Sequence, residues 1–251
     1  MIKTPLNNKK VKNVINYNPR FLWFVILTYS MLSLLSNWFM VCTISLGWLI
    51  LNAGLLIFPI NFLLSNLITE VYGYKHARRA VWCGFFFNLL FIVYGQAVIY
   101  MPGPNYSIHN PLFDKLITTY LKDALISVTS YFTIEPLNLF FSAKSKIYMN
   151  GYLMKLRFIL ATSLSITMVG IIFSLVKFHD SIFYIKLLPA LFFTGITIIV
   201  SSPIVVYFAK KIKKIEQIDI YDTNTKFNMF CFEVNYTAEN NKFYKDYQEL
   251  K

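Results

Sequence analysis

The sequence predicts an all-α, polytopic membrane helix bundle with about six transmembrane helices, two of them interrupted by proline. Of its 251 residues, 56% are hydrophobic and only 14% are charged, and the mean hydropathy is +0.51. A soluble domain carries about 25% charged residues, and so apolar a chain in water would expose patches that promote association. These values exclude most soluble architectures.

Six apolar stretches are long enough to cross a bilayer, which takes about 20 residues in helical form. They cover residues 21–44, 46–67, 81–101, 120–141, 158–176 and 185–208. Proline and glycine at residues 102–104 end the third stretch. The segment from there to residue 119 is predicted to be the longest connecting loop, with room for a short interfacial helix.

Lysine and arginine residues indicate the orientation of the chain, because they concentrate in short cytoplasmic loops. Basic clusters occur before the first stretch and after the second, fourth and sixth stretches. With six spans all four clusters fall on one side, so both termini are expected in the cytoplasm. The net charge of +12 does not predict nucleic-acid binding, since apolar runs separate the clusters and no single basic face results. The expected partner is the lipid bilayer.

Three regions follow from this pattern: a basic amino-terminal segment (1–20), a six-span domain (21–208) and a cytoplasmic carboxy-terminal tail (209–251). The first segment resembles the basic part of a signal peptide. The apolar run behind it is too long and lacks a cleavage site, so we expect it to remain as the first span. The tail is predicted to be a partly disordered extension, with a short docked hairpin at residues 230–236 as the alternative.

Polar residues inside the predicted spans indicate the interior of the bundle, because each costs free energy in hydrocarbon unless it faces a cavity or a partner. Glu135 lies deep in the fourth span beside Pro136, which removes a backbone donor and distorts the helix. Two interpretations of Glu135 are open: a functional carboxylate, or a structural ion pair with a cation such as Arg157. Glu70, at the end of the second span, is expected to pair with Arg78 and Arg79.

Pro59 lies in the middle of the second predicted span as Pro136 lies in the fourth. Transporters build their midplane sites from helices interrupted at corresponding positions, but prolines also occur in spans for packing reasons. Both interpretations are kept. Some aromatic residues could stack on a planar ligand, although any single ring more often faces lipid. These residues are Trp38, Trp48, Tyr131 and Phe132.

Motifs of catalytic, metal and cofactor sites are missing from the sequence. The three histidines (76, 109 and 179) fall in predicted loops, and neither a phosphate loop nor a nucleophile elbow occurs. The three cysteines (42, 83 and 231) have no metal-ligand spacing and are too few for a disulfide framework. We therefore expect no enzymatic activity, no catalytic residue, no metal and no cofactor.

The densest pattern comprises residues 58–62 (FPINF), 65–67 (SNL), 70–74 (EVYGY) and 77–82 (ARRAVW). It resembles the bacterial queuosine-precursor transporter family, which is also called the vitamin-uptake-transporter-like family. Residues 35–37 (LSN), Arg157 and residues 161–162 (AT) look like further family positions. The resemblance implies a multi-pass importer in the bacterial inner membrane, whose substrates are 7-deazaguanine bases or queuine. These purine-like compounds feed modification of the tRNA wobble base.

The sequence departs from the family pattern at several polar positions. Asn66 and Asn138 stand where the family commonly has Asp, Glu135 stands where Gln is expected, and Ile166 and Val169 replace polar residues. A deazaguanine presents a ring N–H and an amine side by side, and a carboxylate accepts hydrogen bonds from both. We expect Glu135 to take over this task. The full set of expected substrate-binding residues is Glu135, Asn138, Asn66, Asn37 and Glu70.

The leading hypothesis is a secondary or facilitative importer that binds a planar purine-like base near the midplane of the bilayer. One alternative is a substrate-binding membrane subunit with a separate energy-supplying partner, or a transporter of another small planar metabolite or vitamin. A membrane-embedded enzyme is a third hypothesis, which the missing motifs disfavour.

Overall fold

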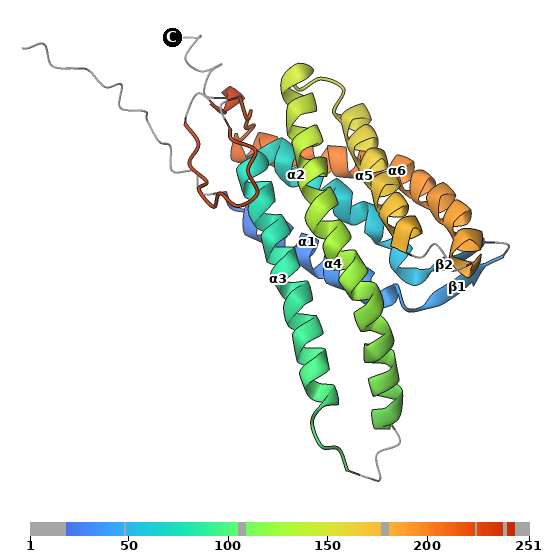
Figure 1. The fold of residues 1–251 in the computed structure, drawn as a ribbon. Helices are drawn as coiled ribbons and strands as arrows, with labels where there is room; N and C mark the ends of the chain where they lie inside the picture. The colour runs from blue at the N-terminus through green and yellow to red at the C-terminus, as the bar shows by residue number, and fades with distance from the viewer. Residues whose placement is uncertain are drawn as a thin grey trace, which may run out of the picture.

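The computed structural model describes residues 19–47, 49–104, 109–176, 181–223, 225–237 and 240–243. It confirms the prediction of an all-α membrane bundle (Figure 1). Within these ranges, five helical segments are long and apolar enough to cross a membrane: Leu22–Phe39, Ala53–Tyr72, Tyr74–Ile99, Met154–Leu175 and Leu187–Glu216. The fourth predicted span, 120–141, lies inside a 40-residue helix and stays a prediction.

The elements in chain order are α1 (Leu22–Phe39), β1 (Thr43–Leu46), β2 (Leu49–Asn52), the 3₁₀-helix η1 (Ala53–Leu56), α2 (Phe58–Tyr72), α3 (Tyr74–Ile99), α4 (His109–Tyr148), α5 (Met154–Val176) and α6 (Ser181–Glu216). Helices α3 and α4 extend as a pair beyond the rest of the bundle (Figure 1).

A β-hairpin replaces helix where the first two spans were predicted to meet. The predicted first span continued to residue 44, but α1 ends at Phe39 and an antiparallel pair follows, with Thr43 opposite Asn52. Gly47 has φ +65° between the strands, a conformation that glycine adopts without the usual steric cost. The β-branched Thr43 and Ile44 also favour a strand. The boundaries predicted for these two spans are therefore wrong at this turn.

Pro59 does not interrupt a helix, and this prediction is wrong. It lies in the first turn of α2, where a missing N–H costs little because no acceptor is available within the helix. The second span is instead broken at Ile57, between η1 and α2. Pro136 lies inside α4 as predicted, and α6 contains two further prolines, Pro189 and Pro203.

Two predicted loops are largely helical. Gly73 alone separates α2 from α3, so His76 lies on a helix, as do the basic residues that follow it. Helix α4 begins at His109, which shortens the predicted loop at residues 102–119. His179 lies outside the described residues.

Helix α2 is the centre of the bundle. Twelve of its 15 residues are buried, and it packs against α1, α3, α4, α5 and α6. The outer helices bury fewer residues and expose large apolar side chains such as Trp23, Leu90 and Leu188. This is the pattern of helices that face lipid. Polar side chains on α2 therefore meet other helices rather than hydrocarbon.

The start of α1 and the ends of α2, α4 and α6, which adjoin the described basic residues, meet at one end of the bundle, which we call the basic end. The backbone N–H of Phe21, at the start of α1, donates to Glu216 at the end of α6 (2.7 Å). Lys146, at the end of α4, donates to the backbone carbonyl of Glu70 at the end of α2 (2.5 Å). The start of α1 thus meets the end of α6, and the end of α2 meets the end of α4, as the positions of the basic clusters along the chain predicted.

The described part of the tail docks on the basic end (Figure 1). Ile220 N–H donates to the Val71 carbonyl (3.2 Å), while Asp222 accepts from Tyr74 N–H (2.8 Å) and from the Tyr236 hydroxyl (2.9 Å). Burial raises the pKa of Tyr236 well above its ordinary value, so its hydroxyl keeps the proton that it donates. Residues 230–236 form turns and irregular chain rather than the alternative hairpin, and residues 244–251 lie outside the description.

We expect Gly73→Ala to destabilise the fold. Gly73 has φ +84° and ψ 168°, a region that costs other residues about 1–3 kcal/mol. An added Cβ would also overlap the Tyr236 hydroxyl and lie 2.8 Å from Ile220 Cγ2. Thermal unfolding in detergent should show a clearly lower midpoint. Gly195→Ala in α6, where a Cβ meets nothing within 4 Å, is the matched control; equal midpoints for the two variants would contradict the argument.

Candidate functional site

Two adjoining cavities lie in the half of the bundle away from the basic end. Their volumes are about 130 Å³ and about 30 Å³. The larger is lined by the hairpin, η1, α4, the start of α2, the end of α5 and the start of α6. The smaller is lined by α1, α2, α4 and α5. They share the lining residues Met40, Phe58, Ser127, Val169 and Phe173.

Two residues that line the smaller cavity each carry a buried acceptor atom with no hydrogen-bond partner among the described residues. Glu135 is fully buried, and its Oε1 accepts from the Tyr29 hydroxyl (3.0 Å), while its Oε2 is unpaired. Asn61 is 5% exposed, and its Oδ1 is unpaired. A buried acceptor without a donor costs about 1–3 kcal/mol. Because both residues line one cavity, a ligand with two donor groups would find an acceptor on each of them.

The remaining walls favour a flat apolar ligand. Phe58 and Phe173 line both cavities, and Phe62 lines the smaller one, with its ring centroid 5.2 Å from that of Phe58. Such pockets combine apolar walls with a few polar groups that orient the ligand. The arrangement suits a ring system whose faces are apolar and whose edge donates hydrogen bonds.

Asn37 also lines the smaller cavity, as expected for a binding residue. Its Nδ2 donates to Asn88 Oδ1 (2.8 Å), and Asn88 in turn donates to Ser33 Oγ (3.2 Å). This chain of bonds between α1 and α3 holds the Asn37 amide in place.

Asn138 and Asn66 are buried but do not line either cavity. Asn138 Nδ2 donates to Ser65 Oγ (2.9 Å), and Asn66 Nδ2 donates to Thr162 Oγ1 (2.9 Å). Both asparagines therefore join helices between the cavities and the basic end. Their predicted contact with a ligand stays a prediction.

Glu70 does not pair with Arg78 or Arg79, and this prediction is wrong. Its buried carboxylate accepts from Arg157 Nη1 (2.8 Å) and Lys213 Nζ (2.6 Å). The chain reverses at Gly73, so the arginines of α3 face the tail, while α5 and α6 bring their cations to the end of α2. Because Arg157 pairs with Glu70, it is not the ion-pair partner of Glu135 that the second interpretation of Glu135 named.

The two arginines of α3 bind the tail instead. Arg78 donates to the backbone carbonyls of Asn228 (2.5 Å) and Glu233 (3.0 Å), and Arg79 donates to that of Phe232 (3.0 Å). These bonds add to the docking of the tail on α3.

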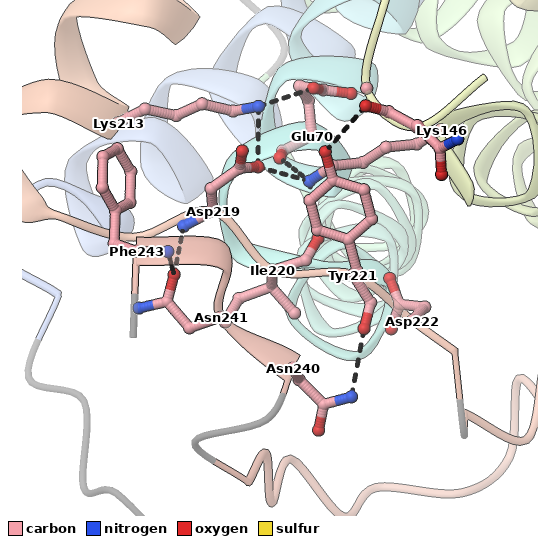
Figure 2. Close-up of polar contacts among 12 residues, drawn as sticks. Glu70, Lys146, Lys213, Asp219, Ile220, Tyr221, Asp222, Asn240, Asn241 and Phe243 are labelled. Atoms are coloured by element: carbon pink, nitrogen blue, oxygen red, sulfur yellow. Dashed lines mark hydrogen bonds and ion pairs between the residues drawn. The ribbon is translucent and has the colours of Figure 1, made fainter. Parts of the chain in front are cut away.

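Glu70 belongs to a larger charge cluster, which comprises Glu70, Lys146, Arg157, Lys213 and Asp219. Asp219 Oδ1 accepts from Lys146 and from Lys213, each at 2.7 Å. Lys146 also donates to the Ile220 carbonyl (2.6 Å). Figure 2 shows both lysine ammonium groups between Glu70 and Asp219. The cluster joins α2, α4, α5, α6 and the tail.

The expected binding set did not include several residues that line the cavities: Ser33, Ser36, Phe58, Asn61 and Phe173. Asn61 lies in the FPINF pattern, which was the available signal. The aromatic candidates Trp38 and Phe132 pack against other rings instead, and Trp48 and the side chain of Tyr131 lie outside the description. Among the described residues, no three His, Cys, Asp or Glu side chains converge as metal ligands.

Glu70→Gln should lower stability, because it leaves Arg157 and Lys213 buried with one negative charge fewer. Breaking a buried pair costs about 3–5 kcal/mol. We expect a lower unfolding midpoint in detergent and a smaller yield of folded protein. Asp114→Asn removes one charge from a partly exposed residue of α4 and serves as the control. A Glu70→Gln protein as stable as this control would show that the ion pairs contribute little.

Comparison with known proteins identifies a family. The family described as "Putative vitamin uptake transporter" matches residues 52–208. Neither a curated protein nor a solved structure matches the chain. The matched region contains all the described residues of α2, α3, α4 and α5, and it includes Asn61 and Glu135.

Proposed function

Because the chain belongs to the vitamin uptake transporter family, we propose that it imports a small planar ring compound, and that its substrate is a 7-deazaguanine base used as a queuosine precursor. The observation that carries this proposal is the pair of unpaired acceptors, Glu135 Oε2 and Asn61 Oδ1, on two residues that line one cavity. The resemblance to queuosine-precursor transporters supports the identity of the base.

The chemistry of the cavity fits the hydrogen-bonding edge of such a base. A ring N–H and an exocyclic amine would donate to Glu135 and Asn61, while Phe58 and Phe173 would flank the faces of the ring. Cavities of about 130 and 30 Å³ are smaller than typical pockets of about 300–1,000 Å³ for drug-sized ligands. This size favours the free 7-deazaguanine bases over queuine, which carries an additional ring.

Four of the five expected site residues, all except Glu70, have a role in the proposed transport of the base. Glu135 is the main ligand, Tyr29 holds its Oε1, and Asn37 forms part of the cavity wall. Asn138 and Asn66 contact the base after it leaves the cavity. The protein moves the base without changing it, as a secondary or facilitative transporter rather than an enzyme.

The proposed location is the bacterial inner membrane, with the basic end and both termini in the cytoplasm, because lysine and arginine concentrate on that side. The cavities lie in the opposite half of the bundle, so the base would reach them from outside the cell. This arrangement requires α4 to cross the membrane in addition to the five segments named above, which gives six spans in total.

Reporter fusions test the topology. A fusion at Lys251 should report the cytoplasm and one at Asn110 the opposite side, because α4 crosses the membrane between its start and the basic end. A reporter whose activity depends on the compartment provides the readout. The same side for both fusions would overturn the six-span arrangement.

Uptake by Glu135 variants tests the binding site. A charge-assisted hydrogen bond contributes about 1.5–3 kcal/mol, so its loss should weaken binding roughly ten- to over a hundredfold. Glu135→Gln keeps the shape and one acceptor, whereas Glu135→Ala loses both acceptors. Uptake should therefore fall in the order native, Gln, Ala. Thr133→Ala, at an exposed position of the same helix, should retain native uptake.

The measurement uses labelled 7-deazaguanine bases and queuine in cells that lack their own importer and synthesis. If the Glu135→Ala protein inserts into the membrane and takes up the base at the native rate, the binding site lies elsewhere. Uptake by the purified protein alone in lipid vesicles would also exclude an obligatory energy-supplying partner, which the alternative of a binding subunit requires.

A further inference from the structure

A file of buried polar side chains runs from the cavities to the basic end. It consists of Asn61, Ser65, Asn66, Thr69 and Glu70 on α2, Glu135, Asn138, Ser142 and Lys146 on α4, and Arg157, Thr162 and Ser165 on α5. Each of these residues is at most 5% exposed. Polar groups at this depth are costly in a membrane and mark the routes of substrates and ions.

The file is continuous along the helices. With a rise of about 1.5 Å per residue, Asn61 and Glu70 are about 14 Å apart along α2, and Glu135 and Lys146 about 16 Å apart along α4. Hydrogen bonds between Asn138 and Ser65 and between Ser165 and Asn138 connect the three helices midway. Asn66 Oδ1 has no partner among the described residues, so an acceptor is also available on this route.

The charge cluster closes the file at the basic end. Glu70 joins α2 to Arg157 of α5 and Lys213 of α6, and Lys146 of α4 lies beside them. Residues 218–222 of the tail cross this point, where Ile220 bonds to Val71 and Asp219 binds both lysines. Neither cavity is lined by a member of the cluster.

We propose that this file is the exit path of the transported base, and that the charge cluster with residues 218–222 is the gate at its cytoplasmic end. The inference rests on the proposed function, because a path of this kind serves a transporter. Opening separates Glu70 from its cations and moves residues 218–222 off the end of α2.

The charges of the cluster explain how Asp219 holds the gate. Three cations meet two carboxylates, Glu70 and Asp219, and Asp219 is the one that the tail supplies. Without its charge, three buried cations share one carboxylate, and their repulsion favours separation of the helices. Asp219→Asn should therefore shift the protein toward the state that is open at the basic end.

Cysteine labelling tests this shift without a substrate. The reporter is Ser142→Cys, at a buried position of α4 in the file, in a chain whose three native cysteines are replaced by serine. An impermeant maleimide is applied to the basic side in inverted membrane vesicles. The reporter should react slowly with Asp219 intact and about tenfold faster with Asp219→Asn. The labelling rate follows the fraction of protein in the open state, and the loss of a buried charge pair is large enough to change the equilibrium between closed and open states about tenfold.

Glu233→Gln is the control, because Glu233 is an exposed acid of the tail that lies outside residues 218–222, and its backbone carbonyl, which the substitution keeps, accepts from Arg78. It should leave the labelling rate unchanged. An unchanged rate in Asp219→Asn, or an equal increase in both variants, would overturn the assignment of the cluster as the gate.

A reversible cross-link covers the case in which Asp219→Asn does not fold. The backbones of Val71 and Ile220 are hydrogen-bonded (3.2 Å), so Val71→Cys with Ile220→Cys places two thiols near disulfide distance. The oxidised protein should bind labelled base but not transport it, and reductant should restore transport. Native transport by the oxidised protein would overturn the gate. Absence of binding and uptake in the native protein would instead reject the proposed function and leave the labelling result standing.

Discussion

The fully buried carboxylate of Glu70 is the constraint on which the arrangement of the bundle depends. Burial costs several kcal/mol for each ion unless opposite charges and hydrogen bonds compensate it. Helix α2 is surrounded by other helices, so the compensation has to come from them. Arg157 brings α5 and Lys213 brings α6 to the end of α2, and Asp219 brings the tail to the same place. One buried acid thus joins four parts of the chain that are far apart in sequence.

The second buried acid, Glu135, has a different environment. No cation lies within ion-pair distance of it among the described residues, and the Tyr29 hydroxyl satisfies only one of its oxygen atoms. Glu70 is therefore held by cationic side chains, whereas Glu135 is a lining residue of a cavity. Sequence alone does not distinguish these two buried acids, but the structure gives them different partners: cations for Glu70 and a tyrosine hydroxyl for Glu135. The two acids lie at opposite ends of the polar file.

The sequence predicted the helices better than their ends and partners. Long apolar runs set the spans because hydrocarbon requires internally bonded backbone, and the basic clusters correctly grouped the helix ends. The hairpin after α1 was missed because its strands are as apolar as a helix, and Pro59 was misplaced because a proline that starts a helix and one that interrupts it look alike in sequence. Arg78 and Arg79 were near Glu70 in sequence, but the reversal at Gly73 directs them to the tail.

By itself the sequence determined that this is a multi-pass membrane protein, that the ends of α2, α4 and α6 with their basic residues meet at one end, and that Glu135 lies in the interior. These properties depend on composition, spacing and the cost of exposing polar groups to lipid, all of which are local. The tertiary structure decided which cations bind Glu70, that Asn61 joins Glu135 at the cavity, and that Asn138 and Asn66 lie between the cavity and the basic end. Those contacts depend on how helices from distant parts of the chain pack side by side, and no spacing along the chain specifies that.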